Sequence, residues 1–243
     1  MEKSNKIYLV IIIVCSVLVV GLCAYAIINH KDIEETDAIK FKNEYESLNG
    51  VVNENNEKEY MKVEVDSENP IIYKSGQEIL DVLENENAIV YFGFSSCPWC
   101  RNVVPILLEA AKENNLDKIY YVDILNMRDQ YKFSGSIEPE LIKKGTDAYY
   151  EILKFLDKKL EKYYVTDDSG NMYDTGVKRL YAPTVVAVKD GKALDLHVST
   201  LDSQKDPYVA LSDEQKEELK DIYKDLIKQI KDDNKACKED EAC

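Results

Sequence analysis

Cys97 and Cys100 are the residues of this sequence whose type and spacing point most directly to chemistry. Two residues, Pro98-Trp99, separate them, and an apolar run from Ala88 to Phe94 comes just before them. Such a pair can exchange a disulfide with another molecule, supply part of a zinc site, or form a small structural disulfide. The elements that flank the pair help to choose among these three uses.

The pair is predicted to lie where a buried strand ends and a helix begins. Residues 88 to 94 are β-branched and aromatic, which is typical of a buried strand, and Pro98 fits the first turn of a helix. The N-terminus of a helix stabilises an anion, so Cys97 is predicted to be the exposed nucleophile and Cys100 the resolving thiol. Trp99 is predicted either to contact a substrate peptide or to pack on a neighbouring loop.

The two other uses of the pair are less well supported. A zinc site usually needs about four ligands, and the remaining candidates, His30, His197, Cys237 and Cys243, lack the spacing of a second ligand pair. A disulfide that closes so short a loop removes little chain entropy and is a poor structural staple. The sequence therefore predicts no metal and no cofactor beyond the redox-active cysteines.

Cys237 and Cys243 lie in an acidic tail, residues 232 to 243. One interpretation is a local disulfide without a catalytic role, as exported proteins often contain. The other is a second dithiol that exchanges with Cys97 and Cys100 as a tethered relay. The sequence leaves both interpretations open.

Strands and helices are predicted to alternate along the main part of the chain. Strands are predicted at 61–65, 88–94, 119–125, 184–188 and 193–198, with a further hairpin over 164–179. Helices are predicted after Ser75, after Cys97, from Pro139 to Tyr163 and from Ser212 onward. This alternation indicates parallel pairing with a late antiparallel hairpin, and hence an α/β fold with a mixed central sheet flanked by helices.

The cysteine pair and a later proline segment resemble the thioredoxin superfamily. Pro105 lies eight residues after Cys97, where thioredoxins carry a helix-kinking proline, and APTVVAVKDGK at 182–192 resembles their cis-proline segment. The resemblance covers roughly residues 60 to 231 and implies a thioredoxin-like fold. It also implies that Pro183 is cis and faces the cysteines, and that the backbone of Ala182 pairs with substrate as an added strand.

Two features depart from that family pattern. Typical thioredoxins have a buried aspartate six residues before the first cysteine, which accepts the proton of the resolving thiol, whereas Tyr91 stands there in this chain. The chain between Cys97 and Pro183 is also longer than in a minimal thioredoxin. The surplus, residues 126 to 180, is predicted to be an insertion that either shapes a partner site or covers a sheet edge.

The N-terminal region predicts a membrane anchor. Residues 7 to 28 form an uncharged apolar run long enough to cross a bilayer. Lys3 and Lys6 precede the run and an acidic stretch follows it, so residues 1–6 are predicted to be cytoplasmic and the main domain extracytoplasmic. The alternative is a secreted protein whose signal peptide is cleaved near Ala26.

Charge and composition narrow the remaining predictions. The formal net charge of −15 argues against nucleic acid as a partner. Residues 29–59 are polar and acidic and are predicted to be a tether before a domain that begins at Tyr60. Arg101 is predicted either to lower the pKa of Cys97 or, as is commoner, to be a solvated charge on the first helical turn.

Together these features predict an extracytoplasmic bacterial thiol–disulfide oxidoreductase, anchored in the cell membrane by a single span. Its partners would be protein thiols and disulfides of exported or cell-surface proteins. Because the chain has no nucleotide motif, an unidentified membrane or extracytoplasmic redox partner would exchange electrons with it. The alternative is a non-catalytic accessory or binding protein on the same scaffold, in a secretion or bacteriocin-export system.

Overall fold

The structure is a computed structural model that describes residues 8, 12–22, 35–54, 56–135 and 138–231. The chain divides into two units, residues 1–36 and 37–243. Residues 12–22 of the first unit are helical. Within the described parts of the chain, no helix is long and apolar enough to cross a membrane. Residues 1–6, parts of the predicted span 7–28 and the position near Ala26 lie outside the described residues.

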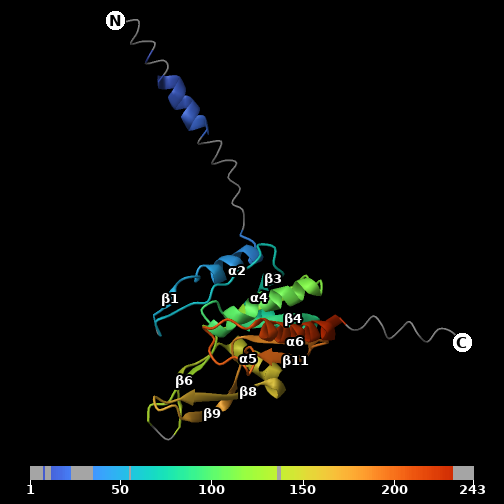
Figure 1. The fold of residues 1–243 in the computed structure, drawn as a ribbon. Helices are drawn as coiled ribbons and strands as arrows, with labels where there is room; N and C mark the ends of the chain where they lie inside the picture. Colours follow the sequence, from blue (N-terminus) through green and yellow to red (C-terminus); the bar gives the residue numbers. More distant parts are fainter. Residues whose placement is uncertain (1–7, 9–11, 23–34, 55, 136–137, 232–243) are drawn as a thin grey trace, which may run out of the picture. The chain divides into compact units, whose positions relative to one another are not determined.

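The second unit is built on a mixed five-stranded sheet, which confirms the predicted α/β fold with a mixed central sheet (Figure 1). The strand order is β3, β5, β4, β10 and β11, in which β3, β5 and β4 are parallel and β10 is antiparallel to both β4 and β11. The strands are β3 (Ile71–Tyr73), β4 (Ala88–Gly93), β5 (Ile119–Asp123), β10 (Thr184–Lys189) and β11 (Lys192–Val198).

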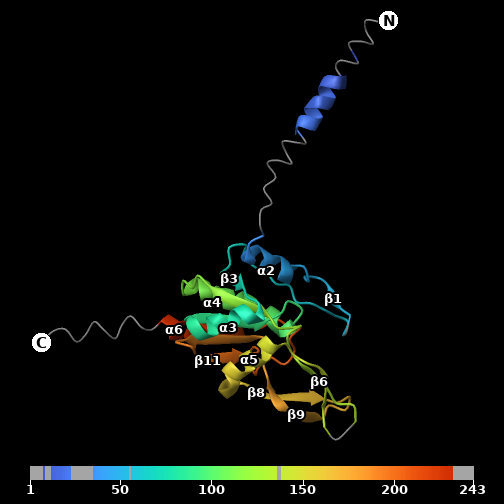
Figure 2. The same cartoon turned by 180° about the vertical axis from the view of Figure 1, so that it is seen from behind.

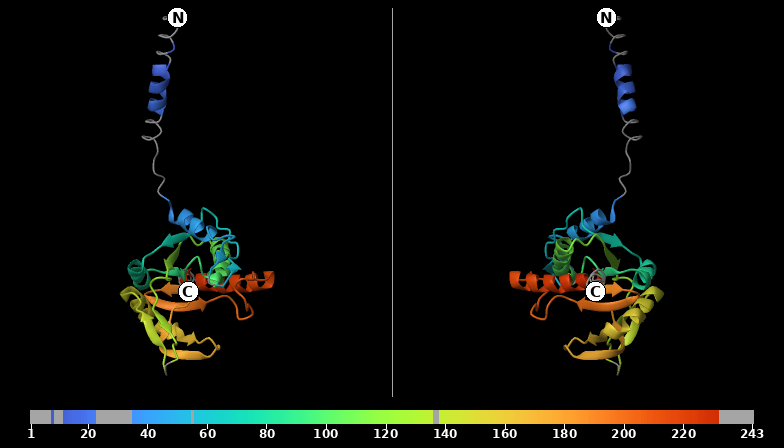
Figure 3. Two further views of the ribbon diagram at one scale, coloured as in Figure 1. Left: turned by 90° about the vertical axis from the view of Figure 1, so that its left-hand side faces the viewer. Right: turned by 90° about the vertical axis from the view of Figure 1, so that its right-hand side faces the viewer.

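Helices cover both faces of this sheet (Figure 3). One face packs against α2 (Asp37–Glu46), α4 (Pro98–Glu113) and α6 (Asp213–Lys231), and the other against α3 (Gly76–Asn85) and α5 (Asp147–Leu156). Because both faces are covered, every residue of β4 is buried. Its side chains alternate between the faces, with Tyr91 toward α4 and Val90 toward α3.

The prediction of a tether over residues 29–59 is wrong from Asp37 onward, while residues 29–34 lie outside the described part. Residues 37–46 form α2, and Phe41 and Tyr45 on that helix are fully buried against the sheet. These two aromatic residues lie one helical turn apart, so they share one face of an otherwise polar helix. After α2, β1 (Val52–Asn53) and β2 (Lys58–Glu59) form a short antiparallel hairpin.

The strand predicted at 61–65 is absent, although its alternating residues Val63 and Val65 are buried. Side chains bind the backbone there in place of a neighbouring strand. The Asn49 amide bonds both the N–H and the carbonyl of Val63, at 2.9 and 2.8 Å. Glu46 and Lys42 bond the N–H and the carbonyl of Val65. The alternation therefore reflects burial, and β3 is the edge strand.

The chain between β5 and β10 forms two hairpins around a helix (Figures 1 and 2). The elements are β6 (Gln130–Lys132), β7 (Glu140–Lys143), α5, the 3₁₀ turn η1 (Asp157–Lys159), β8 (Glu161–Thr166) and β9 (Met172–Arg179). The hairpin predicted over 164–179 is confirmed as β8–β9. The two hairpins lie side by side at one end of the unit, away from α4 and α6 (Figure 2).

The helix predicted from Pro139 begins later, at Asp147. A Cβ on Gly145 would lie 2.9 Å from the Tyr149 ring and 3.0 Å from the Met127 carbonyl, so the chain passes these groups in a turn that glycine permits. The Thr146 hydroxyl accepts a hydrogen bond from the Tyr149 N–H and caps the helix start. Residues 140–143 form β7 instead of the first helical turn.

Candidate active site

Cys97 and Cys100 lie where β4 gives way to α4. Cys97 is the N-cap of α4, and its Sγ accepts a hydrogen bond from the Cys100 N–H at 3.3 Å. Pro98 occupies the first helical turn, where a backbone N–H would have no acceptor within the helix. A proline there therefore costs no hydrogen bond. Both cysteines are free thiols. This local geometry is the one that the sequence predicts.

Cys97 is less accessible than predicted. Only 4% of its surface is exposed, and Cys100 is fully buried. The Cys97 thiol lies under the loop that leads into β10, where it donates to the Ala182 carbonyl at 3.4 Å. The backbone of Ala182 therefore covers the Cys97 thiol.

The pKa of the Cys97 thiol is lowered from its ordinary value. Burial alone would raise it, but hydrogen bonds from the Cys100 thiol and from the N–H groups of Cys100 and Trp99 outweigh burial. The charge of Arg128 lowers this pKa further. A thiolate on Cys97 is thus stabilised by the helix N-terminus and by one nearby cation.

The Cys100 thiol is shifted in the opposite direction. Burial raises its pKa well above the ordinary value, and the neighbouring Cys97 raises it further. A hydrogen bond from the Tyr91 hydroxyl opposes this rise. The two cysteines therefore have distinct roles available to them, since one ionises readily and the other is held as a thiol.

The segment Ala182-Pro183 lies directly over Cys97. The peptide bond between the two residues is cis, as the resemblance predicts. Two hydrogen bonds hold the segment at the start of β10: the Thr184 hydroxyl donates to the Tyr181 carbonyl at 2.7 Å, and the Ser199 N–H donates to the Pro183 carbonyl at 2.8 Å. The pairing of Ala182 with a substrate strand stays a prediction.

Trp99 is half-buried and packs against the cluster that contains α4 and α6. This side chain therefore packs on the protein itself, and its predicted packing on a neighbouring loop and its contact with a substrate peptide both stay predictions. Cys237 and Cys243, the proposed second dithiol, lie outside the described residues, as does His30. The His197 Nε2–H donates to the Thr200 carbonyl, 2.7 Å away, and among the described residues no group of metal-ligating side chains is present.

The expectation that Arg101 is a solvated charge is wrong. Its side chain is fully buried. It donates to the carbonyls of Met61, Tyr45 and Ser95 and, at 2.6 Å, to the Asn49 side chain. These acceptors come from the segment around α2 and from the loop after β4. Arg101 therefore fastens the N-terminal part of the unit to the start of α4.

Arg128 is the cation that acts on Cys97, and the sequence analysis did not select it. It follows β5, and its guanidinium group lies 4.9 Å from the centre of the Phe94 ring. The pKa of Arg128 is lowered by burial and by the charge of Arg179, while Cys97 and Cys100 act in the opposite direction. Its position just beyond the carboxyl end of β5, beside β4, was the signal that could have identified it.

Tyr45 was also missed, because it lies in the segment read as a tether. Its hydroxyl is 2.8 Å from that of Tyr91, and both side chains are fully buried. A polar and acidic stretch gives no sign that one of its tyrosines is buried in the same cluster as Cys100.

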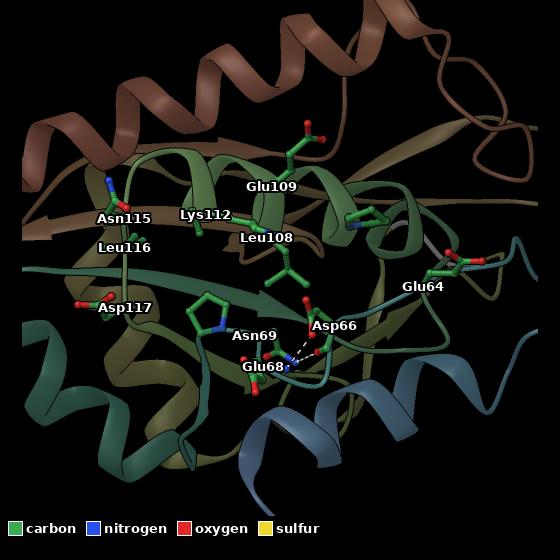
Figure 4. Close-up of a pocket in the computed structure, with 13 residues that line it drawn as sticks. Glu64, Asp66, Glu68, Asn69, Leu108, Glu109, Lys112, Asn115, Leu116 and Asp117 are labelled. Atoms are coloured by element: carbon green, nitrogen blue, oxygen red, sulfur yellow. Dashed lines mark hydrogen bonds between the residues drawn. The ribbon is translucent and has the colours of Figure 1, made fainter.

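A groove of about 650 Å³ lies between α4 and residues 64–70 (Figure 4). Leu108, Glu109 and Lys112 of α4 line one side of it, and Asp66 and Asn69 the other. Neither cysteine lines this groove, so it is separate from the candidate active site.

The sequence matches no protein family model and no curated protein. The functional argument therefore depends on the geometry of the site.

Proposed function

We propose that this protein is a thiol–disulfide oxidoreductase with a thioredoxin-like fold, in which Cys97 and Cys100 exchange electrons with the cysteines of other proteins. The observation that carries the proposal is the opposite shift of the two thiol pKa values at the N-terminus of α4. An attacking thiol needs a thiolate near neutral pH, whereas a resolving thiol has to wait until the mixed disulfide forms.

The fold supports this proposal. The order β3, α3, β4, α4, β5, then β10, β11 and α6, resembles the thioredoxin arrangement, with residues 126–180 as an insertion before β10. The cysteines lie at the carboxyl end of the central strand β4, which is where open α/β sheets bind their ligands.

The reaction follows from the two thiols. The Cys97 thiolate attacks one sulfur of a substrate disulfide, and the other substrate sulfur leaves with the electron pair. Cys100 then attacks Cys97 Sγ, which forms the Cys97–Cys100 disulfide and releases the first substrate sulfur with its electron pair. The oxidised protein runs the same steps in reverse with a substrate dithiol. No cofactor is needed, but a separate redox partner has to return the pair to its starting state.

The location of the protein is part of the proposal. The apolar run over residues 7–28 is proposed to anchor it in a bacterial cell membrane, with the catalytic unit outside the cytoplasm. Protease added to intact cells without a wall is expected to degrade the catalytic unit while the N-terminal segment remains in the membrane fraction. Recovery of a shortened, soluble protein from the medium would instead indicate cleavage near Ala26.

Insulin reduction by the full-length chain in detergent tests the activity. The wild-type protein is expected to accelerate the reduction of insulin by dithiothreitol, and Cys97→Ser is expected to abolish the acceleration. Cys15→Ser is the matched control, because Cys15 is a free thiol that lies in the proposed membrane span. If the wild-type protein is no faster than Cys97→Ser, the protein is not an oxidoreductase and the accessory role becomes the better account.

Cys100→Ser is expected to trap substrates. With the resolving thiol removed, mixed disulfides on Cys97 accumulate and can be separated on a non-reducing gel. The same variant tests the tail: a Cys97–Cys237 or Cys97–Cys243 bond would support an internal relay, and its absence would leave the tail cysteines without a role in exchange.

A further inference from the structure

Three buried tyrosines belong to the same core cluster as the resolving thiol. Tyr45 comes from α2, Tyr91 from β4 and Tyr223 from α6, and each is fully buried. We propose that Tyr91, supported by Tyr45, and Tyr223 form a pocket of hydroxyl donors that stabilises the thiolate of Cys100 as it attacks Cys97. This inference rests on the proposed function and assigns residues to its second step.

Tyr91 is held in a fixed position by its own strand. Its ring lies over Gly93, where an added Cβ would be only 2.3 Å from the Tyr91 hydroxyl. The ring also stacks on Tyr121, with centroids 5.3 Å apart. The phenol thus points along β4 toward the carboxyl end of the strand. The helix that carries Cys100, α4, begins just after this end.

Tyr45 completes a chain of hydroxyl groups. Its hydroxyl lies 2.8 Å from that of Tyr91, and both tyrosines belong to the buried cluster that contains Cys100. When Tyr91 donates to the sulfur, its oxygen is free to accept from Tyr45. The chain then runs from Tyr45 through Tyr91 to Cys100, and each donor strengthens the next.

Tyr223 is an unused donor. Among the described residues, its buried hydroxyl has no hydrogen-bond partner. A buried polar group without a partner destabilises a fold, so the presence of the Tyr223 hydroxyl needs an explanation. Two titratable groups neighbour this phenol: Cys100, which acts on its pKa, and His197, whose ring lies 5.9 Å from the Tyr223 ring. A thiolate on Cys100 would supply the missing acceptor.

The phenols act as donors and not as bases. Burial raises the pKa values of Tyr45, Tyr91 and Tyr223 well above the ordinary value, so all three stay protonated throughout the physiological range. Besides these phenols, the charged and titratable groups around the cluster include Cys97 and Arg128, which act with Cys100, Glu44, which acts on Tyr45, and His197, whose ring lies 5.9 Å from the Tyr223 ring.

The step that these donors assist is balanced without another reactant. Cys100 loses its proton to the departing substrate sulfur and attacks Cys97 Sγ. The Cys97–substrate bond breaks, the Cys97–Cys100 bond forms, and the substrate sulfur leaves with the electron pair as a thiol. Each phenol keeps its proton and donates to the sulfur of Cys100 while that sulfur carries negative charge.

Two-phase release of a coloured thiolate tests the inference. The reduced full-length chain, with Cys15, Cys23, Cys237 and Cys243 changed to serine, is mixed with dithiobis-nitrobenzoate. Attack by Cys97 releases the first nitrothiobenzoate, and attack by Cys100 on the resulting mixed disulfide releases the second. Tyr91→Phe is expected to slow the second phase by about tenfold or more and leave the first phase unchanged.

Tyr223→Phe separates a functional role from a structural one. Removal of an unpartnered buried hydroxyl is expected to leave the melting temperature unchanged or raised, while the second phase slows. Tyr121→Phe is the matched control, since that hydroxyl bonds Glu44 at 3.2 Å and not a cysteine. The control is expected to leave both phases as in the parent chain.

The pH profile of the second phase provides a second readout. Loss of a donor to the Cys100 thiolate moves the midpoint of the second phase to higher pH, whereas a general perturbation lowers the rate equally at every pH. An unchanged second phase in both Tyr91→Phe and Tyr223→Phe overturns the inference while the proposed function stands. Absence of the first phase in the parent chain overturns the proposed function itself.

Discussion

Arg101 donates a hydrogen bond to the side chain of Asn49 at 2.6 Å and thereby joins the start of α4 to the segment that follows α2. The same guanidinium group binds the carbonyls of Tyr45 and Met61, at 2.8 and 2.7 Å. A buried cation with neutral acceptors thus connects the first part of the folded unit, residues 37–61, to the helix that carries the cysteines.

Arg101→Ala is expected to destabilise the protein by about 3 kcal/mol, because it leaves a cavity and several buried acceptors without a donor. Urea unfolding followed by circular dichroism measures the change. Lys216→Ala is the control, since Lys216 forms an exposed ion pair with Asp213 and is expected to change stability by about 0.5 kcal/mol or less. An equal, small effect of both substitutions would contradict the role given to Arg101.

Arg128→Gln is expected to raise the pKa of Cys97, because it removes the positive charge that helps to lower it. The rate of alkylation of Cys97 at neutral pH then falls a few-fold, and its midpoint moves to higher pH. Arg128→Lys keeps the charge and is expected to retain most of the effect. A pH profile that is identical for the wild type and for Arg128→Gln would rule out this electrostatic role.

Cys97 is expected to make the stability of the reduced protein depend on pH. Its pKa in the folded state is lowered, so its contribution is fully present above the unfolded pKa of about 8.5 and is lost as pH falls through the folded pKa. The difference in unfolding free energy between the reduced protein and Cys97→Ala is therefore expected to grow as pH rises toward about 8.5. A difference that shrinks over this range would mean that the pKa is raised.

Gly93→Ala is expected to displace the Tyr91 ring, because the new Cβ would lie 2.3 Å from the phenol oxygen and 2.8 Å from Cε2. Overpacking of this kind costs about 1–3 kcal/mol. In a Tyr91→Ala background the ring is absent, and the same substitution is expected to cost much less. Equal costs in both backgrounds, measured by a double-mutant cycle, would show that the two residues do not interact.

The sequence was sufficient where local chemistry decides the structure. Cys97 begins a helix because Pro98 follows it and a buried strand precedes it, and the turn at Asp190-Gly191 forms because both residues adopt a positive φ. The sequence was insufficient where groups far apart in the chain determine whether a side chain is buried. The burial of Arg101 depends on carbonyl oxygens of residues far along the chain, which no spacing rule reveals.

The role of α2 could not be read from composition for a similar reason. Phe41 and Tyr45 are two aromatic residues among mostly polar ones, and they become core residues only because β3, β5 and β4 present Tyr73, Tyr121 and Tyr91 to them. Whether a short apolar stripe of this kind is buried depends on the surface that it packs against.

The dependence of the α4 start on α2 has a practical consequence for anyone who shortens or fuses this protein. A fragment that starts at Tyr60, where composition suggests that the domain begins, lacks Tyr45 and Asn49, and with them two of the four acceptors of Arg101. Such a fragment keeps both cysteines but lacks Tyr45, which belongs to the same buried cluster as Cys100. The better place to cut lies before Asp37, so that α2 stays with the unit that carries both cysteines.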